Sequence, residues 1–341
     1  MSTAAIVILN WNGQHFLNRF LGEVVKKSNQ EGVSVYVADN GSTDNSVAWI
    51  KENQPEVTLI EFEKNYGFTG GYNKALAQID ADYFILLNSD IEVTKGWVKH
   101  LIDKMDNNPN VGICMPKIRS YLSKPSNIFE YAGAAGGYID LLGYPFCRGR
   151  ILSNIEEDNG QYDHDSQIFW ASGACMMVRS TLWRELGGLD ESFFAHMEEI
   201  DFCWRAKLVG NQVWVFPGSV VYHVGGGTLP NNSPKKLFLN FRNNLLMLYK
   251  NLSPARLFPI LFIRMLLDGA AAIVYILQGK FNFFISVIEA HVDFWKRVPK
   301  IERSKRVTNL QLNSVFKGSI IISFFISFMR LRFRDIEENI S

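Results

Sequence analysis

Hydrophobic and polar residues alternate in blocks along roughly the first ninety positions. Four short apolar runs predict buried strands, and polar or glycine-containing turns follow them, at residues 4–9, 33–38, 57–62 and 83–87. Helical patterns separate these runs, for instance near residues 72–79. Strands that alternate with helices predict right-handed βαβ crossovers and a mostly parallel sheet. The sequence therefore predicts an α/β fold in which helices flank a sheet.

A polar side chain stands at the end of each predicted strand. These side chains are Asn10, Asp39, Asn65 and Asp90. In open α/β sheets, ligands bind beyond the carboxyl ends of the strands. One shared site explains four polar strand ends better than four unrelated turns do.

The middle of the chain has a weaker pattern. Residues 117–167 are rich in Gly and Tyr and predict irregular loops or a short antiparallel subsheet. The other expected elements are strands at 174–178, 213–216 and 220–223, a helix from about Met197 and a helix over 237–249. We place the first domain at residues 1–252.

Residues 253–341 predict a helical region that associates with a membrane. Residues 257–277 are apolar over about the thickness of a bilayer, yet Arg264 and Asp268 stand in the middle of this run. These two residues are four apart and can pair on one helix face, whereas two charges at mid-span are costly in lipid. We therefore expect an interfacial or bundled helix instead of a spanning one. The apolar run at residues 318–329 is too short to span.

Charge is unevenly distributed along the chain. The 341 residues carry a net charge of +1, but from Ala255 onward 13 Lys and Arg stand against 7 Asp and Glu. Six of these basic residues fall within residues 296–306. A basic, apolar tail on an acidic body argues against nucleic acid as the main partner and favours an anionic membrane surface.

Cysteine spacing and the N-terminus bear on the compartment. The four cysteines form no CxxC pair, so we expect free, mostly buried thiols in a reducing compartment. No basic segment precedes the short apolar run at the N-terminus, and we expect no signal peptide. The expected location is therefore the cytoplasm, with the protein peripheral on the inner face of the cytoplasmic membrane.

Two acidic strand ends are candidates for ligand contacts. Asp39 begins the sequence DNGSTD, which is typical either of a helix-capping turn or of a carboxylate that accepts the N–H of a pyrimidine base. Asn88, Ser89 and Asp90 follow a buried run, and oxygen ligands of this kind suit Mg²⁺ or Mn²⁺ against a diphosphate. The alternative is a polar strand end that caps a helix.

A GxxGG motif begins at Gly67 and continues through Gly70 and Gly71. It matches neither the dinucleotide fingerprint nor the P-loop. The glycines either let the backbone approach a phosphate ahead of a helix or serve as simple turn glycines.

An acidic triplet, Glu198, Glu199 and Asp201, lies among aromatic residues and Met197. An apolar setting raises the pKa of a carboxyl towards the range of a general base. Part of the triplet is also explained by a helix N-terminus and by an Asp201–Arg205 ion pair. His223 precedes Gly225–Thr228, which suits either a structural strand end or a mobile lid over a substrate.

Seven motifs in order resemble a family 2 inverting glycosyltransferase of the GT-A fold, in the bacterial rhamnosyltransferase-like branch. The resemblance runs from residue 8 to about residue 252, and its motifs are ILNWNG, VADNGSTDNS, NYGFTGGYNKAL, LLNSDIEV, WASGACMMVR, GGLDESFFAHMEEIDFCWR and VYHVGGGT. Two positions depart from the family pattern. Asn88 replaces the first acid of a DxD motif, and Glu199 stands where the family has the Asp of a Glu-Asp pair.

The resemblance implies the roles of the site residues. Glu199 would be the catalytic base, with Glu198 as the alternative, while Asp90 and His223 would hold a divalent cation, Mg²⁺ or Mn²⁺. Asp39 would bind the nucleotide base. The residues expected around the nucleotide sugar are Asn10, Asn12, Asp39, Asn40, Asn65, Gly67, Asn73, Asn88, Ser89, Asp90, Gly173 and Asp201.

The implied reaction transfers a sugar to a hydroxyl of a saccharide or lipid-linked acceptor in cell-surface polysaccharide synthesis. The branch implies dTDP-rhamnose as donor, with UDP- or GDP-sugars as alternatives. Two other function classes stay open. A sugar nucleotidyltransferase would carry a Gly/Arg/Lys-rich signature near the first strand, where this chain has NWNG. A non-catalytic, membrane-bound nucleotide-sugar-binding protein would bind the same ligand without turnover.

Overall fold

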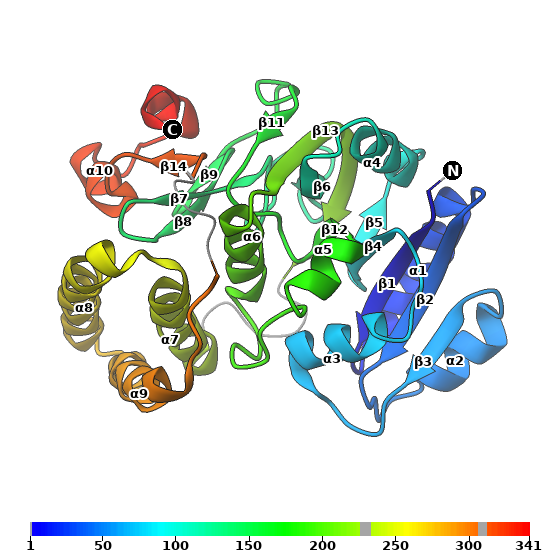
Figure 1. The fold of residues 1–341 in the computed structure, drawn as a ribbon, viewed down its shortest axis with the longest axis horizontal. Coiled ribbons are helices and arrows are strands. Elements are labelled where there is room, and N and C mark those ends of the chain that lie inside the picture. Colours follow the sequence, from blue (N-terminus) through cyan, green and yellow to red (C-terminus); the bar gives the residue numbers. More distant parts are fainter. Residues whose placement is uncertain (1, 226–232, 306–311) are drawn as a thin grey trace.

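The computed structural model describes residues 2–225, 233–305 and 312–341, and a large mixed sheet forms its centre (Figure 1). Four parallel strands lie side by side in the order β3 (Thr58–Glu61), β2 (Val33–Asp39), β1 (Ala4–Asn10) and β4 (Tyr83–Asn88). Asn10 is in register with Asp39, and Leu9 with Asn88. The predicted strands are confirmed, and their polar ends meet at one edge.

The other half of the sheet contains antiparallel neighbours. β12 (Cys175–Arg179) runs antiparallel between β4 and β6 (Val111–Ser120), and β13 (Gln212–His223) runs parallel to β6. The short strands β5 (Ile91–Val93) and β11 (Ser166–Gln167) pair antiparallel with β13. The two strands expected at 213–223 are thus one strand, with a break in register between Phe216 and Val220.

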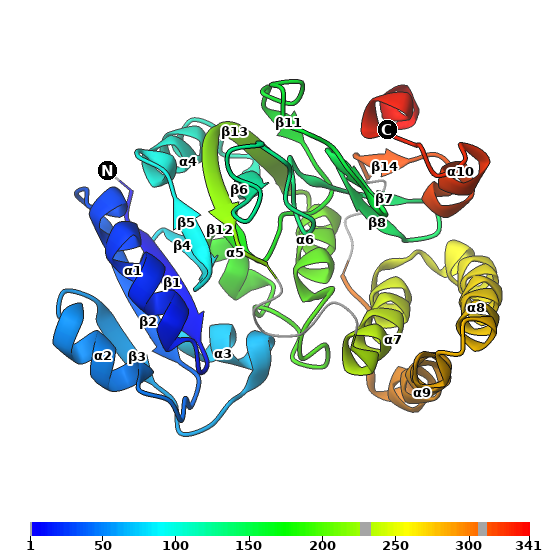
Figure 2. The same cartoon turned by 180° about the vertical axis from the view of Figure 1, so that it is seen from behind.

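Helices cover both faces of the sheet, as predicted. In Figure 2, α1 lies in front of the first strands, and it packs against α2 and α4. In Figure 1, α3 and α6 lie in front, with α5 beside them. These helices are α1 (Gln14–Ser28), α2 (Ser46–Asn53), α3 (Gly67–Leu76), α4 (Trp97–Asp106), α5 (Ser180–Glu185) and α6 (Glu198–Leu208).

The helix expected near residues 72–79 begins earlier, at Gly67, so the GxxGG glycines lie inside α3 and not ahead of it. They allow close packing. A Cβ atom at Gly71 would lie only 2.7 Å from the side chain of Leu9 on β1. At least this glycine is therefore required by contact between the helix and the sheet.

A second sheet lies beside the first and includes a strand from the C-terminal tail. Its order is β10 (Asn154–Ile155), β9 (Arg150–Ile151), β8 (Pro145–Cys147), β7 (Gly137–Asp140) and β14 (Val315–Phe316). The subsheet expected within residues 117–167 is therefore present. Because β14 pairs with β7 and Phe333 packs against Tyr138, the tail is part of the same structural unit. The division of the chain at residue 252 stays a prediction.

The remaining helices gather at one end of the molecule (Figure 1). They are α7 (Pro234–Asn251), α8 (Pro254–Leu277), α9 (Phe281–Arg297) and α10 (Ile320–Ile326), with 3-10 turns at Val298–Lys300, Phe333–Asp335 and Glu337–Asn339. Arg264 and Asp268 are buried within this group and pair at 3.7 Å, as predicted. By length and composition, α8 is the one helix in the described part of the chain that could cross a membrane.

Candidate active site

The ends of β1 and β2 form a hydrogen-bonded edge. Asn10 donates from Nδ2 to Asp39 Oδ2 at 2.9 Å and to Ser42 Oγ at 3.2 Å, while the Ser42 amide donates to Asp39 Oδ1 at 2.8 Å. Asn10 and Asp39 are both buried. The structure therefore brings these two predicted residues together, with each Asp39 oxygen already accepting a hydrogen bond.

Asn12 connects the first turn to the DNGSTD segment. Its backbone has a φ of 51°, and its Oδ1 accepts hydrogen bonds from the amides of Thr43 and Asp44 at 2.7 and 3.3 Å. Asn is among the residues that tolerate this left-handed conformation. The exposed indole of Trp11 stands immediately before it.

Asn40 joins the end of β2 to the start of α3. Its Nδ2 donates to Asn65 Oδ1 at 3.1 Å and to the Gly67 carbonyl at 3.0 Å, while its Oδ1 accepts from the Tyr66 amide at 2.9 Å. Asn65 Oδ1 also accepts from the Gly67 amide at 2.7 Å. One hydrogen-bonded network, made by Asn40, Asn65 and Gly67, thus fixes the start of α3 against the end of β2.

Asn73 and Gly173 occupy different surroundings. Asn73 exchanges hydrogen bonds of 2.8 and 2.9 Å with the backbone of Leu189, so it braces the loop that leads to the acidic helix. A Cβ at Gly173 would lie 3.7 Å from Cβ of Glu199. The next residue, Ala174, accepts a hydrogen bond from the Asn88 amide at 2.9 Å. Gly173 therefore lies between the acidic helix and the end of β4.

Asp90 and His223 meet at the end of β13. His223 Nε2 lies 3.1 Å from Asp90 Oδ1 and 3.5 Å from Asn88 Nδ2, and the Gly225 amide donates to Asp90 Oδ2 at 3.2 Å. The pairing of β5 with β13 explains this meeting, because it sets His223 opposite Ile91. Ser89 lies beside them, with its Oγ 3.6 Å from the Cβ position of Gly13.

Glu130 is a further acid at this place, and no motif in the sequence points to it. Its Oε1 lies 3.3 Å from His223 Nδ1 without good hydrogen-bond alignment. Burial alone would lower the pKa of His223, but the Asp90 and Glu130 carboxylates outweigh burial and raise this pKa to about 10. Burial would raise the pKa of Asp90, yet the hydrogen bonds from His223 and Gly225 lower it. Without a bound cation the group is thus an imidazolium between two carboxylates, and His223 would have to release this proton to coordinate a cation.

The donor set at Asp90 suits a divalent cation that is shared with a diphosphate. Within the described residues no three His, Cys, Asp or Glu side chains are arranged to hold a metal ion by themselves. Asp90 and His223 supply one carboxylate and one imidazole 3.1 Å apart. Mg²⁺ and Mn²⁺ sites commonly combine one or two protein ligands with substrate phosphates. Asp90 and His223 fit this pattern.

The acidic helix α6 begins after a strained loop. Phe194, His196 and Met197 have φ values of 66°, 68° and 72°, which non-glycine residues rarely adopt. Such backbone persists only where neighbouring structure fixes it, and it clusters at functional sites. This loop delivers Glu198 and Glu199 to the first turn of the helix.

Several buried polar atoms in this region lack a hydrogen-bond partner. They are Glu198 Oε2, Glu199 Oε2, His196 Nε2 and Trp204 Nε1. Buried polar groups in folded proteins are rarely left unpaired, so a group of them indicates a place for a polar ligand. The candidate site includes these atoms together with the polar strand ends.

The two glutamates differ in protonation. Burial raises the pKa of Glu199 to about 7. Burial and the neighbouring Glu199 and Asp201 carboxylates raise the pKa of Glu198 well above its usual range. The environment of Glu198 therefore favours its neutral form, whereas Glu199 can give up or accept a proton near neutral pH.

Asp201, another residue predicted to lie around the nucleotide sugar, is bonded within the protein. Its carboxylate is fully buried, and it accepts hydrogen bonds from Arg205 at 2.8 Å, Lys250 at 2.9 Å and Asn251 at 2.8 Å. The engagement of both oxygens by α6 and α7 favours a structural role, and a contact of Asp201 with the nucleotide sugar stays a prediction. The Asp201–Arg205 ion pair that the spacing allowed is present. Residues 226–228 of the proposed lid lie outside the described residues.

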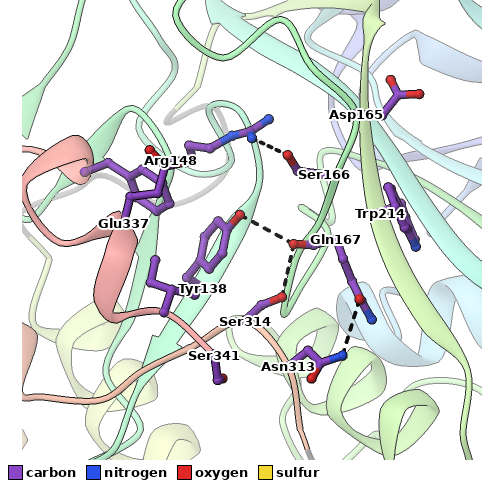
Figure 3. Close-up of a pocket in the computed structure, with 12 residues that line it drawn as sticks. Tyr138, Arg148, Asp165, Ser166, Gln167, Trp214, Asn313, Ser314, Glu337 and Ser341 are labelled. Atoms are coloured by element: carbon purple, nitrogen blue, oxygen red, sulfur yellow. Dashed lines mark hydrogen bonds between the residues drawn. The ribbon is translucent and has the colours of Figure 1, made fainter.

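A pocket of about 570 Å³ lies elsewhere, between the second sheet, β11 and the C-terminal tail (Figure 3). In it, Ser314 Oγ donates to the Gln167 carbonyl at 3.0 Å, and Arg148 donates to Ser166 Oγ. None of the predicted site residues lines this pocket.

Comparison with known proteins gives a consistent result. A model of the family described as Glycosyl transferase family 2 matches residues 5–183. N-acetylglucosaminyl-diphospho-decaprenol L-rhamnosyltransferase of Mycobacterium tuberculosis is 28% identical over 243 residues, which make up 65% of this chain and 76% of that protein.

Two solved structures share the fold. S. aureus TarS 1–349 in complex with UDP-GlcNAc superposes with a TM-score of 0.58 at 16% identity, over 87% of this chain and 82% of that chain. The mannosyltransferase PcManGT from Pyrobaculum calidifontis, in complex with GDP-Man and Mn²⁺, gives a TM-score of 0.53 at 12% identity, over 86% and 87% of the two chains. These likenesses show the GT-A arrangement of the sheet and its helices.

Proposed function

The chain belongs to glycosyl transferase family 2 and is a glycosyltransferase, and from this premise we propose an inverting transfer of L-rhamnose to a lipid-linked saccharide. The observation that carries the proposal is the acid pair at the start of α6. Glu199 has an unpaired, buried oxygen and lies next to Gly173, whose neighbour Ala174 is bonded to Asn88 at the end of β4. The proposed base, Glu199, would therefore lie next to the proposed diphosphate site at the end of β4. Family membership favours sugar transfer over nucleotidyl transfer or binding without turnover.

The donor is proposed from the relatives and from the nucleotide edge. The mycobacterial relative is named an L-rhamnosyltransferase, and this supports dTDP-rhamnose. The solved neighbours hold UDP-GlcNAc and GDP-Man, so UDP- and GDP-sugars are the alternatives. Asp39, with Asn10 and Asn12, would receive the nucleoside, and Asn40, Asn65 and Gly67 would keep that edge in place.

In the proposed reaction, Glu199 accepts the proton of an acceptor hydroxyl while the oxygen attacks the anomeric carbon. The bond to the nucleoside diphosphate breaks on the opposite face, so the anomeric configuration inverts. Asp90 and His223 would hold a Mg²⁺ or Mn²⁺ ion, which supplies charge compensation to the leaving diphosphate when bound. The raised pKa of Glu198 favours its neutral form, so that no second negative charge stands beside Glu199.

A transfer assay tests this function. The full chain is incubated with dTDP-rhamnose, UDP-GlcNAc or GDP-mannose, with and without Mn²⁺, and with a prenyl-diphosphate-linked N-acetylglucosamine acceptor. We expect transfer from dTDP-rhamnose and an inverted anomeric configuration by NMR of the product. The donor should also raise the melting temperature, because a ligand of the native state stabilises it. A product with retained configuration would refute the mechanism.

We also propose that the outer faces of α8 and α9 rest on a membrane with anionic lipids. Exposed large apolar side chains recur on α8 and α9 at intervals of mostly three or four residues, which places them along one side of each helix. On α8 they include Phe258, Phe262, Leu266, Ile273 and Leu277; on α9 they are Phe281, Ile285, Ile288, Val292 and Trp295.

The buried face of α8 carries the polar groups instead. Arg264 donates to the Leu142 carbonyl at 3.0 Å and stacks 3.6 Å from the Tyr144 ring, while Asp268 lies 3.2 Å from His291. A surface helix of a protein in water has the opposite arrangement. A helix with its charges inside and its aromatic and aliphatic side chains outside is suited to an apolar medium.

Exposed basic side chains complement anionic headgroups at this end of the molecule. Lys280 lies between α8 and α9, and Lys296 and Lys300 follow at the end of α9. Nearby α10 adds further exposed apolar side chains, including Phe325 and Ile326 (Figures 1 and 2). Lys and Arg near an anionic leaflet contribute about 1 kcal/mol each.

A surface position explains the contacts of α8 better than a spanning one. With 24 residues, α8 is about 36 Å long, which is enough to cross a bilayer. However, Arg264 in mid-helix is bonded to the backbone between β7 and β8. A spanning helix would draw this polar turn into hydrocarbon, where irregular backbone exposed to lipid is not tolerated.

Sedimentation with vesicles tests the membrane proposal. We expect the full chain to bind phosphatidylglycerol vesicles and to bind pure phosphatidylcholine weakly. Ile285→Glu combined with Ile288→Glu should abolish binding, whereas Leu122→Glu, at an exposed site on the catalytic part, should not. If the wild type ignores vesicles but forms dimers that the double variant separates, the face is an interface between copies and the proposal is wrong.

A further inference from the structure

Two adjacent side chains of α7 bind the carbonyl groups of the loop that precedes the proposed base. Asn243 donates from Nδ2 to the carbonyls of Phe193 at 3.0 Å, Ala195 at 2.8 Å and His196 at 2.7 Å. Arg242 donates to the carbonyls of Ser192 at 3.3 Å and Phe193 at 3.0 Å. Two adjacent residues of α7 therefore bind four carbonyl groups of the loop.

The two side chains are themselves held in place. Arg242 donates from Nε to Asn243 Oδ1 at 2.8 Å and pairs with Asp293 on α9 at 3.2 Å. Asp293 also pairs with Arg297 at 2.7 Å. Both Arg242 and Asn243 are buried, so the hydrogen bonds form away from competing water. The arrangement has little freedom to adopt another geometry.

The loop needs such support because its backbone is strained. Phe194, His196 and Met197 all adopt left-handed φ values, and no glycine is present to relieve them. A strained loop keeps its conformation only when surrounding contacts fix it. Met197 is the residue before α6, so its conformation sets the direction in which Glu198 and Glu199 leave the loop.

We propose that Arg242 and Asn243 are positioning residues that fix the backbone of residues 193–197 and thereby the direction of the Glu199 carboxylate. The inference rests on the proposed role of Glu199 as base. The two side chains touch no reacting atom, and their effect on the reaction is exerted through the loop. A displacement of about 1 Å at a catalytic group is enough to reduce turnover about 100-fold.

The same helix provides a matched control. Asn244 is as buried as Asn243, but it donates to the Gly143 carbonyl and accepts from Arg264, on the side away from the loop. Asn244→Ala therefore removes a buried amide and its hydrogen bonds from α7 without touching residues 193–197. This variant should lower the melting temperature, because buried hydrogen-bond partners of the amide are left unsatisfied.

The experiment compares Asn243→Ala with Asn244→Ala in the full chain, with donor and acceptor saturation curves over a range of pH. For Asn243→Ala we expect kcat to fall about 100-fold while the KM for the donor stays within about threefold. The acid limb of its kcat profile should move to lower pH, because a loosened loop lets water reach Glu199. Asn244→Ala should keep the wild-type kcat within about threefold and the wild-type acid limb.

Binding of the donor, measured by thermal shift, shows that each variant is folded. Asn243→Asp provides a second test, since it keeps the size and the bond to Arg242 but turns an oxygen towards the loop carbonyls. Its kcat should fall at least as far as that of Asn243→Ala. The proposal is overturned if Asn243→Ala keeps the wild-type kcat and acid limb, or if Asn244→Ala changes both equally. Full activity of Glu199→Gln would instead refute the assignment of the base.

Discussion

The two sides of the site differ in how their polar groups are satisfied. At the ends of β1 and β2, Asn10, Asp39 and Asn40 bond to one another and to nearby amides, and the buried Oδ1 of Asn10 is left without a partner. At the start of α6, Glu198 and Glu199 each keep an unpaired buried oxygen. A network that is largely complete without ligand forms a preformed cradle, whereas the two unpaired carboxylate oxygens of α6 are groups that can receive a proton or a polar substrate atom. This difference supports the proposal that the first side binds the donor and the second transfers the proton.

The two sides also owe their shape to different contacts. The first is built from turns whose residues are close in sequence or meet through strand pairing, as with Asn10 and Asp39. The second is held by α7, whose Asn243 is 47 residues beyond His196, one of the residues it binds. Substitutions on the first side should therefore affect donor affinity and stability, while those on the second should affect turnover.

The largest effect is expected at Glu199. Glu199→Gln keeps the size of the side chain but removes the proton acceptor, so kcat should fall about 10³-fold while the donor still binds. Glu198→Gln should reduce kcat by less than about tenfold, because the raised pKa of Glu198 favours its neutral form, which the amide resembles. Steady-state kinetics and donor thermal shifts measure both. The reverse order of the two effects would make Glu198 the base.

The next largest loss of turnover is expected on substitution of Asp90, at the proposed diphosphate site. Asp90→Asn removes the carboxylate that would hold the cation, so kcat should fall by about 10²- to 10³-fold. Chelation of divalent metal should reduce the wild-type activity to a similar degree. The stabilisation of the donor complex by Mn²⁺ should disappear in Asp90→Asn. Full wild-type activity in excess EDTA would remove the cation from the mechanism.

A smaller effect follows from the protonation of Glu199. Its pKa is raised to about 7, and the base must be ionised, so kcat should rise with pH and be about tenfold below its plateau at pH 6. The same ionisation acts on stability in the opposite direction. A carboxyl whose folded pKa exceeds its ordinary value of 4.5 stabilises the protein at low pH, and this contribution is lost as pH rises through about 7.

Both changes should be absent from Glu199→Gln, which serves as the reference. Its melting temperature should lack the decline between about pH 5 and 7 that the wild type shows. An acid limb that persists in the residual activity of Glu199→Gln would mean that another group sets the profile. In that case the pH profile would report the ionisation of a group other than Glu199.

Local patterns predicted most of the fold and the first side of the site. The apolar runs gave the strands, and parallel strands bring their polar ends together whatever lies between them. What the patterns missed depends on contacts between distant parts of the chain. Glu130 is 93 residues from His223, and β14 joins a sheet formed by residues far earlier in the chain. The sequence likewise does not reveal that Lys250 and Asn251, 49 and 50 positions further along the chain, bond to Asp201.

The smallest effect on turnover is expected at Asn40, and it tests the first side directly. Asn40→Ala removes three hydrogen bonds that join β2 to the start of α3, so the free energy of unfolding should fall by about 1–3 kcal/mol. The KM for the donor should rise several-fold, since the cradle loses its shape, while kcat should change by less than about threefold. Asn53→Ala, at an exposed position on α2 whose amide bonds only to its own helix, should cost less than about 0.5 kcal/mol. If Asn40→Ala lowers kcat as strongly as Asn243→Ala does, the two sides do not divide binding from turnover, and a single connected network would better describe the site.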